Sequence, residues 1–225
     1  MATFEESAAM KRKRAGEILK RLRKLYPAVH TPLDHDSPLQ MLVATILSAQ
    51  CTDKLVNEVT PALFKKYPDA PAYAGAKPAA LEKMIHATGF FRNKTKSLIG
   101  MGQALAERHG GEVPGTMEEL LAIPGVARKT ANVVLQEAIR PGGPYDGVVV
   151  DTHVRRVAHR LGLTAETDPE KIERDLMALY PRKAWRDVGM DQVIHGRLIC
   201  VARQPKCEEC ALNEVCPKVG VASVE

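Results

Sequence analysis

Residues 116–130, TMEELLAIPGVARKT, decide the fold of this chain. Thr116 and Glu119 have the spacing of a capping box, which opens a short helix. Pro124-Gly125 ends that helix, and a second helix starts near Ala127, because the apolar residues that follow recur at helical spacing. The stretch therefore predicts two helices joined by a tight glycine turn. Such a turn exposes backbone N–H groups at a helix N-terminus, where they can bind a phosphate, although an ordinary turn between two helices has the same local pattern.

Apolar residues recur at helical spacing on both sides of this stretch, and aromatic residues make up only 4% of the chain. We therefore expect an all-α protein. Residues 141–144, PGGP, predict a linker between two parts, because two prolines and two glycines prevent a helix from continuing. The longest uncharged stretch, 37–52, is shorter than the roughly 20 apolar residues of a membrane span, so we expect a buried core helix there. The first helix is expected to bury one face, formed by Ile18, Leu19, Leu22 and Leu25.

The composition is that of an ordinary globular protein, with 45% apolar and 26% charged residues among 225, which excludes a disordered tail or a fibre. The net charge is +5, and all of the excess lies in residues 1–24, where eight Lys and Arg stand against three Glu. This distribution is only a mild indication of a polyanionic partner, so any DNA site further along the chain must depend on local geometry. No secretory signal opens the chain, and we expect a reducing cytoplasm.

Four of the five cysteines lie near the C-terminus, at Cys200, Cys207, Cys210 and Cys216, with a spacing that allows them to converge on one metal centre. Structural zinc usually takes two close cysteine pairs, or a cysteine pair with a histidine pair, and only Cys207 and Cys210 form such a pair here. A cubane iron–sulfur cluster takes one thiolate per iron and tolerates wider spacing. The spacing alone leaves both metals open, with free thiols as a third alternative. The fifth cysteine, Cys51, is predicted to be a small core residue.

Two further residues have both a structural and a catalytic interpretation. Lys129 is predicted to lie one turn into the second helix of the hairpin, off its apolar face. Most such lysines are solvated, but a helix N-terminus and partial burial would lower the pKa of the amine toward that of a nucleophile. Asp151 follows the apolar run 147–150 and precedes another helix, so it is most simply an N-cap, with a catalytic carboxylate as the alternative.

Together these segments resemble the endonuclease III family of base-excision-repair DNA glycosylases, within the helix-hairpin-helix superfamily. The resemblance covers nearly the whole chain. It rests on these motifs: Leu47-Ser48-Ala49-Gln50, Gly89-Phe90-Phe91-Arg92-Asn93-Lys94, Ile123 to Leu135, Val150-Asp151-Thr152-His153, His195-Gly196-Arg197 and the four-cysteine array.

The resemblance implies two all-α domains: a six-helix barrel with the hairpin, residues 30–140, and a discontinuous iron–sulfur domain, residues 1–29 and 141–225. In this family the four cysteines hold a 4Fe–4S cluster. The resemblance also makes Lys129 the nucleophile and Asp151 its carboxylate partner. The positions that would contact DNA are Gln50 and Phe90, which fill the space of an extruded nucleotide, the hairpin residues Gly125, Ala127 and Thr130, and the cluster-loop residues Arg203 and Lys206.

The implied function is that of a bifunctional DNA glycosylase and AP lyase. Such an enzyme removes oxidised pyrimidines from duplex DNA through a lysine Schiff base and cleaves 3′ to the abasic site by β-elimination. We expect a monomer that binds double-stranded DNA with damaged pyrimidines or abasic sites, does not bind membranes, and works in the cytoplasm at the nucleoid. The alternatives are a monofunctional, adenine-type mismatch glycosylase, which typically lacks the lysine, and a non-enzymatic hairpin module with structural zinc.

The chain departs from the usual family pattern at four places. Ala127 replaces the second glycine of the hairpin, and Gln204 occupies a position that is often basic. Phe90 is bulkier than the aliphatic side chain that is common there, and the connector 139–147 is several residues longer. None of these departures removes a catalytic group, but each bears on DNA affinity or lesion preference.

Overall fold

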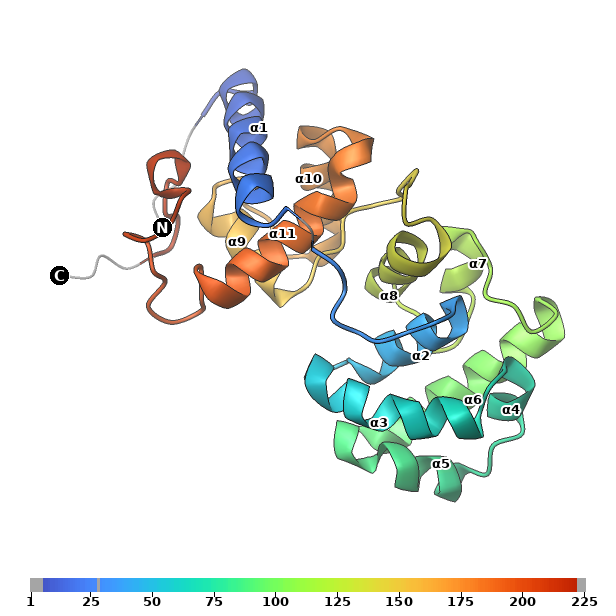
Figure 1. Ribbon diagram of the computed structural model, residues 1–225. Helices are drawn as coiled ribbons and strands as arrows, with labels where there is room; N and C mark the ends of the chain where they lie inside the picture. The colour runs from blue at the N-terminus through green and yellow to red at the C-terminus, as the bar shows by residue number, and fades with distance from the viewer. Residues whose placement is uncertain (1–5, 28, 222–225) are drawn as a thin grey trace. The chain divides into compact units, whose positions relative to one another are not determined.

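The structure is a computed structural model that describes residues 6–27 and 29–221. Every regular element in these residues is a helix, so the prediction of an all-α protein is confirmed (Figure 1). The chain divides into two compact units, one formed by Thr31–Gly143 and the other by Met1–His30 together with Pro144–Glu225. We call them the continuous unit and the discontinuous unit. None of the described helices is long and apolar enough to cross a membrane.

The continuous unit surrounds its own apolar core. Its helices are α2 (Pro38–Leu47), α3 (Asp53–Lys66), α4 (Ala70–Ala74), α5 (Pro78–Ile85), η1 (His86–Thr88), α6 (Phe91–Arg108), α7 (Met117–Leu121), α8 (Arg128–Val134) and the short π-helix η2 (Leu135–Ile139). In α2, every residue from Met41 to Leu47 is buried, which confirms the predicted core helix. The Ser37 side chain caps α2 by accepting a hydrogen bond from the backbone N–H of Gln40. Cys51 packs, partly buried, against the same core, as predicted.

Helices α4 and α6 lie side by side and approach each other at backbone distance (Figure 1). The approach depends on Gly102 of α6, because a Cβ atom there would lie 2.6 Å from the Ala74 backbone nitrogen and 2.7 Å from the Ala70 carbonyl oxygen. Real Cβ atoms do not come this close to backbone atoms. A glycine in the middle of a helix costs backbone entropy, and here that cost is offset by the close packing that it allows.

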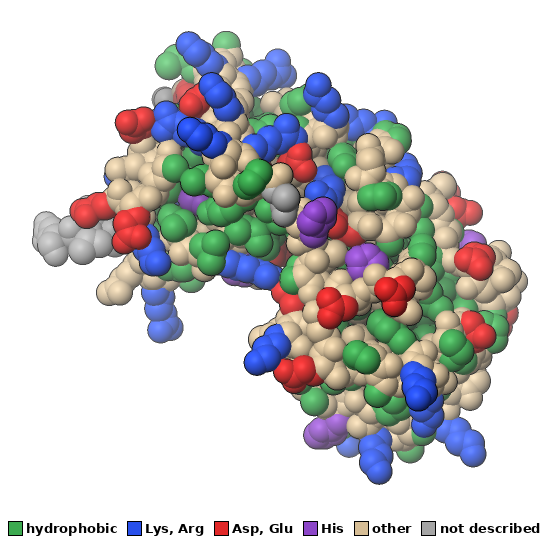
Figure 2. Space-filling view, in the orientation of Figure 1, with side chains coloured by type: hydrophobic (Ala, Val, Ile, Leu, Met, Phe, Trp, Pro, Cys, Tyr) green, Lys and Arg blue, Asp and Glu red, His purple; other side chains and the backbone are tan. Residues whose placement is uncertain are grey.

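The discontinuous unit joins the first helix to the C-terminal part of the chain. Its helices are α1 (Ala8–Leu25), α9 (Thr152–Arg160), α10 (Pro169–Leu179), η3 (Arg182–Ala184), α11 (Trp185–Leu198) and η4 (Asn213–Val215). Helix α1 buries Ala15, Ile18 and Leu22 in the core of this unit. The predicted face of α1 is therefore wrong at Leu25, which is 46% exposed, because the helix ends there and extends past the core. Lys and Arg side chains gather over the outer side of α1 (Figure 2).

The contact at Gly102 gives a direct test of the packing. We expect Gly102→Ala to lower the free energy of unfolding by about 1–3 kcal/mol, because the added methyl group meets backbone atoms that cannot move aside easily. Gly16 in α1 is a matched control, since a Cβ atom there meets nothing within 4 Å. Gly16→Ala should raise stability by roughly 0.5–1 kcal/mol. Thermal and denaturant unfolding of both variants measures the difference, and equal effects would refute the packing argument.

Candidate functional site

The predicted helical hairpin is present in the continuous unit. The Thr116 hydroxyl oxygen accepts a hydrogen bond from the Glu119 backbone N–H at 3.3 Å and donates one to the Glu119 carboxylate at 2.5 Å. These bonds open α7, and the turn to α8 follows. Gly125 in the turn has φ of +82°, and a Cβ atom there would lie 2.5 Å from the Cβ atom of Ser97 in α6. The glycine is therefore required both by its backbone conformation and by the close approach of the turn to α6.

The second helix of the hairpin starts where the sequence predicts. Ala127 is the N-cap of α8, and its methyl side chain provides no capping hydrogen bond. Lys129 is the second residue of the helix rather than a full turn inside it, and its side chain is exposed. Thr130 follows in the same first turn and is half-buried. The helix turns Ala131 and Val134 inward, so the exposed residue Lys129 is held on a helix that is packed against the core.

Three of the predicted DNA-contacting residues line one hollow of the continuous unit. Gln50, Phe90 and Gly125 all border it, and they come from three different segments of the chain. Phe90 is 62% exposed, so it is not a core aromatic residue. Gln50 and Phe90 both have left-handed backbone conformations, with φ of +51° and +46°. Non-glycine residues adopt this conformation at a cost of about 1–3 kcal/mol, and such residues cluster at functional sites.

Lys94 lies beneath the same hollow, and sequence analysis assigned it no role. Its side chain is only 5% exposed, and its amine donates hydrogen bonds to the carbonyl oxygens of Leu47 at 2.7 Å and Thr88 at 2.8 Å. Burial lowers the pKa of this amine. A signal was present in the sequence, because Lys94 shares a helical face with the buried residues Leu98 and Met101. A lysine on an apolar face requires buried acceptors.

Asp151 is the N-cap of α9 in the discontinuous unit, as its structural interpretation predicted. One carboxylate oxygen, Oδ1, accepts hydrogen bonds from the backbone N–H groups of His153 and Val154, both at 2.8 Å. Within the described residues, Oδ2 makes no hydrogen bond, and the side chain is partly exposed. The preceding residues Val148–Val150 are buried and lie outside any helix, which fixes the place where Asp151 emerges from the core. Asp151 and Lys129 belong to different units.

The four C-terminal cysteines lie near one another in the structure. All four line one pocket of the discontinuous unit. Three of their sulfur atoms accept hydrogen bonds at 3.4 Å: Cys210 from the Leu212 N–H, Cys216 from the Lys218 N–H and Cys200 from the Arg160 guanidinium. Among the described residues, no three His, Cys, Asp or Glu side chains come close enough to hold a single metal ion. The arrangement suits a group larger than one ion, because each iron of a cubane cluster takes its own thiolate.

His195 of α11 is a buried residue that lines the cysteine pocket. It is 2% exposed, and burial lowers its pKa to about 4, so the imidazole is neutral at physiological pH. Its Nδ1 atom lies 3.3 Å from the Tyr26 hydroxyl, and its Nε2 atom lies 3.5 Å from the sulfur of Cys210. His195 belongs to the motif His195-Gly196-Arg197, for which the sequence suggested no role. In the structure, its side chain links the end of the first helix, at Tyr26, to the cysteine segment, at Cys210.

The loop between Cys200 and Cys207 carries the predicted basic contacts. Arg203 and Lys206 are exposed in it, and Gln204 between them has a left-handed φ of +51°. Arg160 of α9 holds the start of this loop by donating to the carbonyl oxygens of Val201 at 2.7 Å and Ala202 at 2.9 Å. Arg160 thus fixes the backbone at the start of the loop, while Arg203 and Lys206 remain exposed.

Comparison with known proteins identifies related chains over nearly the full length. Residues 43–182 match the model of the HhH-GPD superfamily base excision DNA repair protein. An endonuclease III from Synechocystis is 54% identical, over 96% of this chain and 98% of that protein. The endonuclease III of Bacillus subtilis is 39% identical, over 88% and 89% of the two chains.

Solved structures agree with these relatives. A non-covalent endonuclease III–DNA complex has a TM-score of 0.86 and 37% identity, covering 92% of this chain and 95% of that one. A trapped endonuclease III–DNA covalent intermediate, an estranged-adenine complex, also has a TM-score of 0.86 and 37% identity, covering 92% of this chain and 96% of that one. A thermostable thymine-DNA glycosylase at 20% identity has a similar fold, with a TM-score of 0.81 and coverage of 92% and 96%.

Proposed function

Because this chain belongs to the endonuclease III family, in the HhH-GPD superfamily of base excision DNA repair proteins, we propose that it is a bifunctional DNA glycosylase and AP lyase that removes oxidised pyrimidines from duplex DNA. The observation that carries the proposal is the match to a solved covalent enzyme–DNA intermediate, together with an exposed lysine in the first turn of α8. A covalent intermediate requires a nucleophile, and a lysine amine forms a Schiff base with a sugar.

Lys129 is the proposed nucleophile. Once the damaged nucleotide is extruded from the duplex, the amine nitrogen bonds to C1′ of the sugar while the bond from C1′ to the base breaks and the base leaves with a proton. Opening of the sugar ring gives an imine. Loss of a proton from C2′ and breakage of the C3′–O bond then cleave the strand by β-elimination, with the phosphate leaving on the 5′ end of the downstream strand, and hydrolysis of the imine releases the lysine.

Asp151 is the proposed carboxylate partner. Its Oδ1 atom is engaged by the N-terminus of α9, which holds the side chain in one orientation. Its Oδ2 atom is available to accept a proton from the lysine ammonium group and to stabilise positive charge on the sugar. The structural and the catalytic interpretations of Asp151 are therefore compatible, because each uses a different oxygen.

DNA binding is assigned to two groups of residues. In the continuous unit, Gln50 and Phe90 occupy the gap left by the extruded nucleotide, and the backbone N–H groups from Gly125 through Ala127 to Thr130 bind a phosphate. In the discontinuous unit, Arg203 and Lys206 contact the phosphate backbone. The accessible position of Phe90 on the rim of the hollow supports its assignment as a wedge.

The family generally carries a 4Fe–4S cluster, and we propose that Cys200, Cys207, Cys210 and Cys216 hold one in this chain, with one thiolate on each iron. The donor set fits, because four sulfurs line one pocket and three of them accept hydrogen bonds of the kind that stabilise thiolates. When bound, such a cluster supplies four metal–sulfur bonds that fix the C-terminal loop. The discontinuous unit is thus the proposed cluster domain and the continuous unit the proposed helical barrel, with boundaries at residues 30/31 and 143/144.

We further propose that the enzyme acts as a monomer at the nucleoid, where chromosomal DNA is its substrate. Lys129 argues against a monofunctional adenine-type glycosylase, because such an enzyme needs no amine nucleophile.

Borohydride trapping tests the proposed chemistry. Incubation of the protein with a duplex containing thymine glycol or another oxidised pyrimidine, in the presence of sodium borohydride, should give a covalent protein–DNA adduct, because borohydride reduces the imine to a stable amine. Lys129→Gln should abolish the adduct. Lys96→Gln, which removes an exposed lysine of α6, is the matched control and should leave it intact. Undiminished trapping by the Lys129 variant would falsify the assignment of the nucleophile.

Two substitutions of Asp151 separate its two roles. Asn caps helices as well as Asp, so Asp151→Asn should leave the free energy of unfolding within about 0.5 kcal/mol of the wild type while lowering kcat about 100-fold or more. Asp151→Ala should lower kcat similarly and also destabilise the protein by about 1 kcal/mol. Single-turnover rates and thermal unfolding give both numbers, and a near-normal glycosylase rate in a folded Asn variant rules out the catalytic role.

The proposed cluster is tested by metal analysis and absorbance. The purified protein should contain iron and absorb at about 400 nm, and Cys216→Ser should lose most of that absorbance because one iron loses its thiolate. Cys51→Ser is the matched control, since Cys51 packs on the other core and should leave the spectrum unchanged. Zinc in place of iron in the wild-type protein would refute the proposal.

A further inference from the structure

We propose that Lys94 is a positioning residue that sets the two DNA-filling side chains, Gln50 and Phe90, on the rim of one hollow. The inference rests on the proposed function and adds to it a residue that does not itself reach the DNA.

The two acceptors of Lys94 are the last residues of two helices. Leu47 ends α2 and Thr88 ends η1, and both carbonyl oxygens bond to the same amine, at 2.7 and 2.8 Å. The final carbonyl groups of a helix have no partner within the helix, and a cation is favourable at that end. One lysine therefore caps two helix C-termini that are 41 residues apart in the chain.

The two segments that leave these helix ends carry the residues in question. Gln50 follows the end of α2 by three residues, and Phe90 follows the end of η1 by two. Both have left-handed backbone conformations, and Gly89 before Phe90 has φ of +70°. Such conformations persist only where the surroundings hold them in place. The hydrogen bonds of Lys94 fix the carbonyl groups from which both strained turns start.

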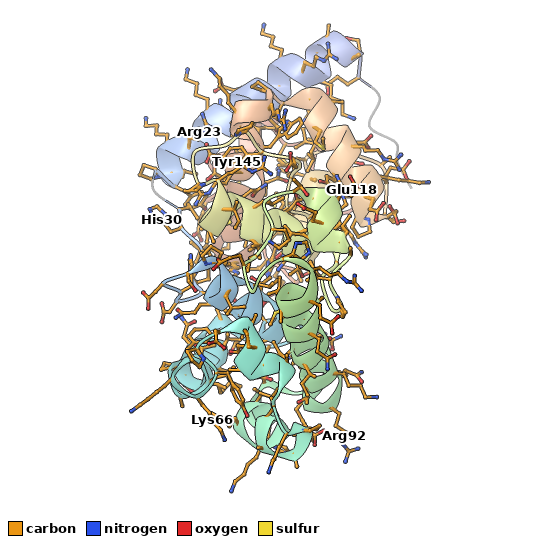
Figure 3. All side chains as sticks on the ribbon, turned by 90° about the vertical axis from the view of Figure 1, so that its right-hand side faces the viewer. Arg23, His30, Lys66, Arg92, Glu118 and Tyr145 are labelled. Atoms are coloured by element: carbon orange, nitrogen blue, oxygen red, sulfur yellow. The ribbon has the colours of Figure 1, made fainter. Side chains whose placement is uncertain are left out.

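The first turns of α6 show that Lys94 differs from its neighbours. Arg92 is exposed and points away from the ribbon (Figure 3), and Lys96 is exposed as well. Lys94 alone among these three basic residues is turned inward, at 5% exposure. Burial of an amine is unfavourable unless it is hydrogen-bonded, which is reflected in the lowered pKa of Lys94. The buried amine of Lys94 holds the carbonyl groups of Leu47 and Thr88, which a solvated lysine would not do.

The same face of α6 also supports the third segment at the hollow. Ser97 lies against Gly125 of the hairpin turn, and Gly100 lies against Pro124, where a Cβ atom would come within 3.0 Å of the proline side chain. Positions 94, 97 and 100 are one helical turn apart and therefore lie on one side of α6. The three DNA-facing segments thus take their positions from a single rigid helix.

A mutant cycle tests the proposal on the cluster-containing, full-length protein. The substrate is a duplex with one abasic site opposite adenine, and the measured quantity is the single-turnover rate of strand cleavage. Lys94→Met keeps the length of the side chain but removes both hydrogen bonds, so Gln50 and Phe90 lose their fixed positions. We expect the rate to fall about tenfold. Lys96→Met is the matched control on the same helix and should leave the rate unchanged.

The decisive comparison repeats Lys94→Met in a Gln50→Ala/Phe90→Ala background. If Lys94 acts through these two side chains, the same substitution should lower the rate there less than about twofold, because nothing is left to position. An equal loss in both backgrounds overturns the proposal, since a general weakening of the fold does not depend on Gln50 and Phe90.

A single-stranded abasic oligonucleotide separates this proposal from the proposed function. It has no opposite base and no gap in a duplex, so the Lys94→Met variant should cleave it at the wild-type rate. Failure of the wild-type protein to cleave either substrate contradicts the lyase function, whereas a normal lyase with no coupling to Lys94 contradicts only the positioning role.

A measurement on the wild type covers the case in which Lys94→Met does not fold. The backbone N–H groups of Cys51 and Gly89 donate to the carbonyl oxygens of Ser48 and His86 within the two turns. If Lys94 holds the turns, both N–H groups should be protected from hydrogen exchange in the free protein. Rapid exchange at both, with protection only after DNA is added, shows that DNA rather than Lys94 orders the turns and overturns the proposal.

Discussion

Helix α6 contributes large apolar residues to the core, and it also contacts its neighbours through small side chains and one buried ammonium group. Gly102 admits the backbone of α4, Gly100 and Ser97 admit the hairpin turn, and Lys94 binds the ends of α2 and η1. A larger side chain at Gly102, or an apolar one at Lys94, would displace a neighbouring backbone or leave its carbonyl groups without partners. The positions of the segments that line the hollow of the continuous unit therefore follow from close packing on one helix rather than from long-range charge.

The discontinuous unit is held together differently. Its first helix is separated by more than a hundred residues from the helices that it packs against, and its core contact is short, with three fully buried residues in α1. Arginine side chains strengthen the contact between chain ends: Arg21 of α1 donates to the Ala211 carbonyl oxygen at 2.9 Å, and Arg160 binds the loop after Cys200. After α11 the described residues form one short helix, η4, so the proposed cluster would supply much of what holds this segment in place.

The sequence predicts those features that arise from local patterns. The capping box at Thr116, the turn at Gly125, the N-cap at Asp151 and the convergence of the cysteines depend on residues close together in the chain, and all are present. The role of Lys94 depends on carbonyl groups of Leu47 and Thr88, which no side-chain pattern reports. The buried face of α1 was misplaced at Leu25 for a similar reason, since periodicity gives the face of a helix but not where its partner ends.

The exposure of Phe90 and the backbone conformations around the hollow lower the stability of the fold. A phenylalanine left in water forgoes about 1.5–3 kcal/mol of burial, and the left-handed conformations of Gln50 and Phe90 cost about 1–3 kcal/mol each. A fold tolerates such costs only where other contacts exceed them, and the buried core beneath the hollow provides those contacts. In the proposed DNA complex the benefit would appear on binding, because side chains already held in place would lose little further conformational freedom. Because the excess positive charge lies in residues 1–24, the proposed contacts of Gln50 and Phe90 with an extruded nucleotide would depend on prepared geometry more than on electrostatic attraction.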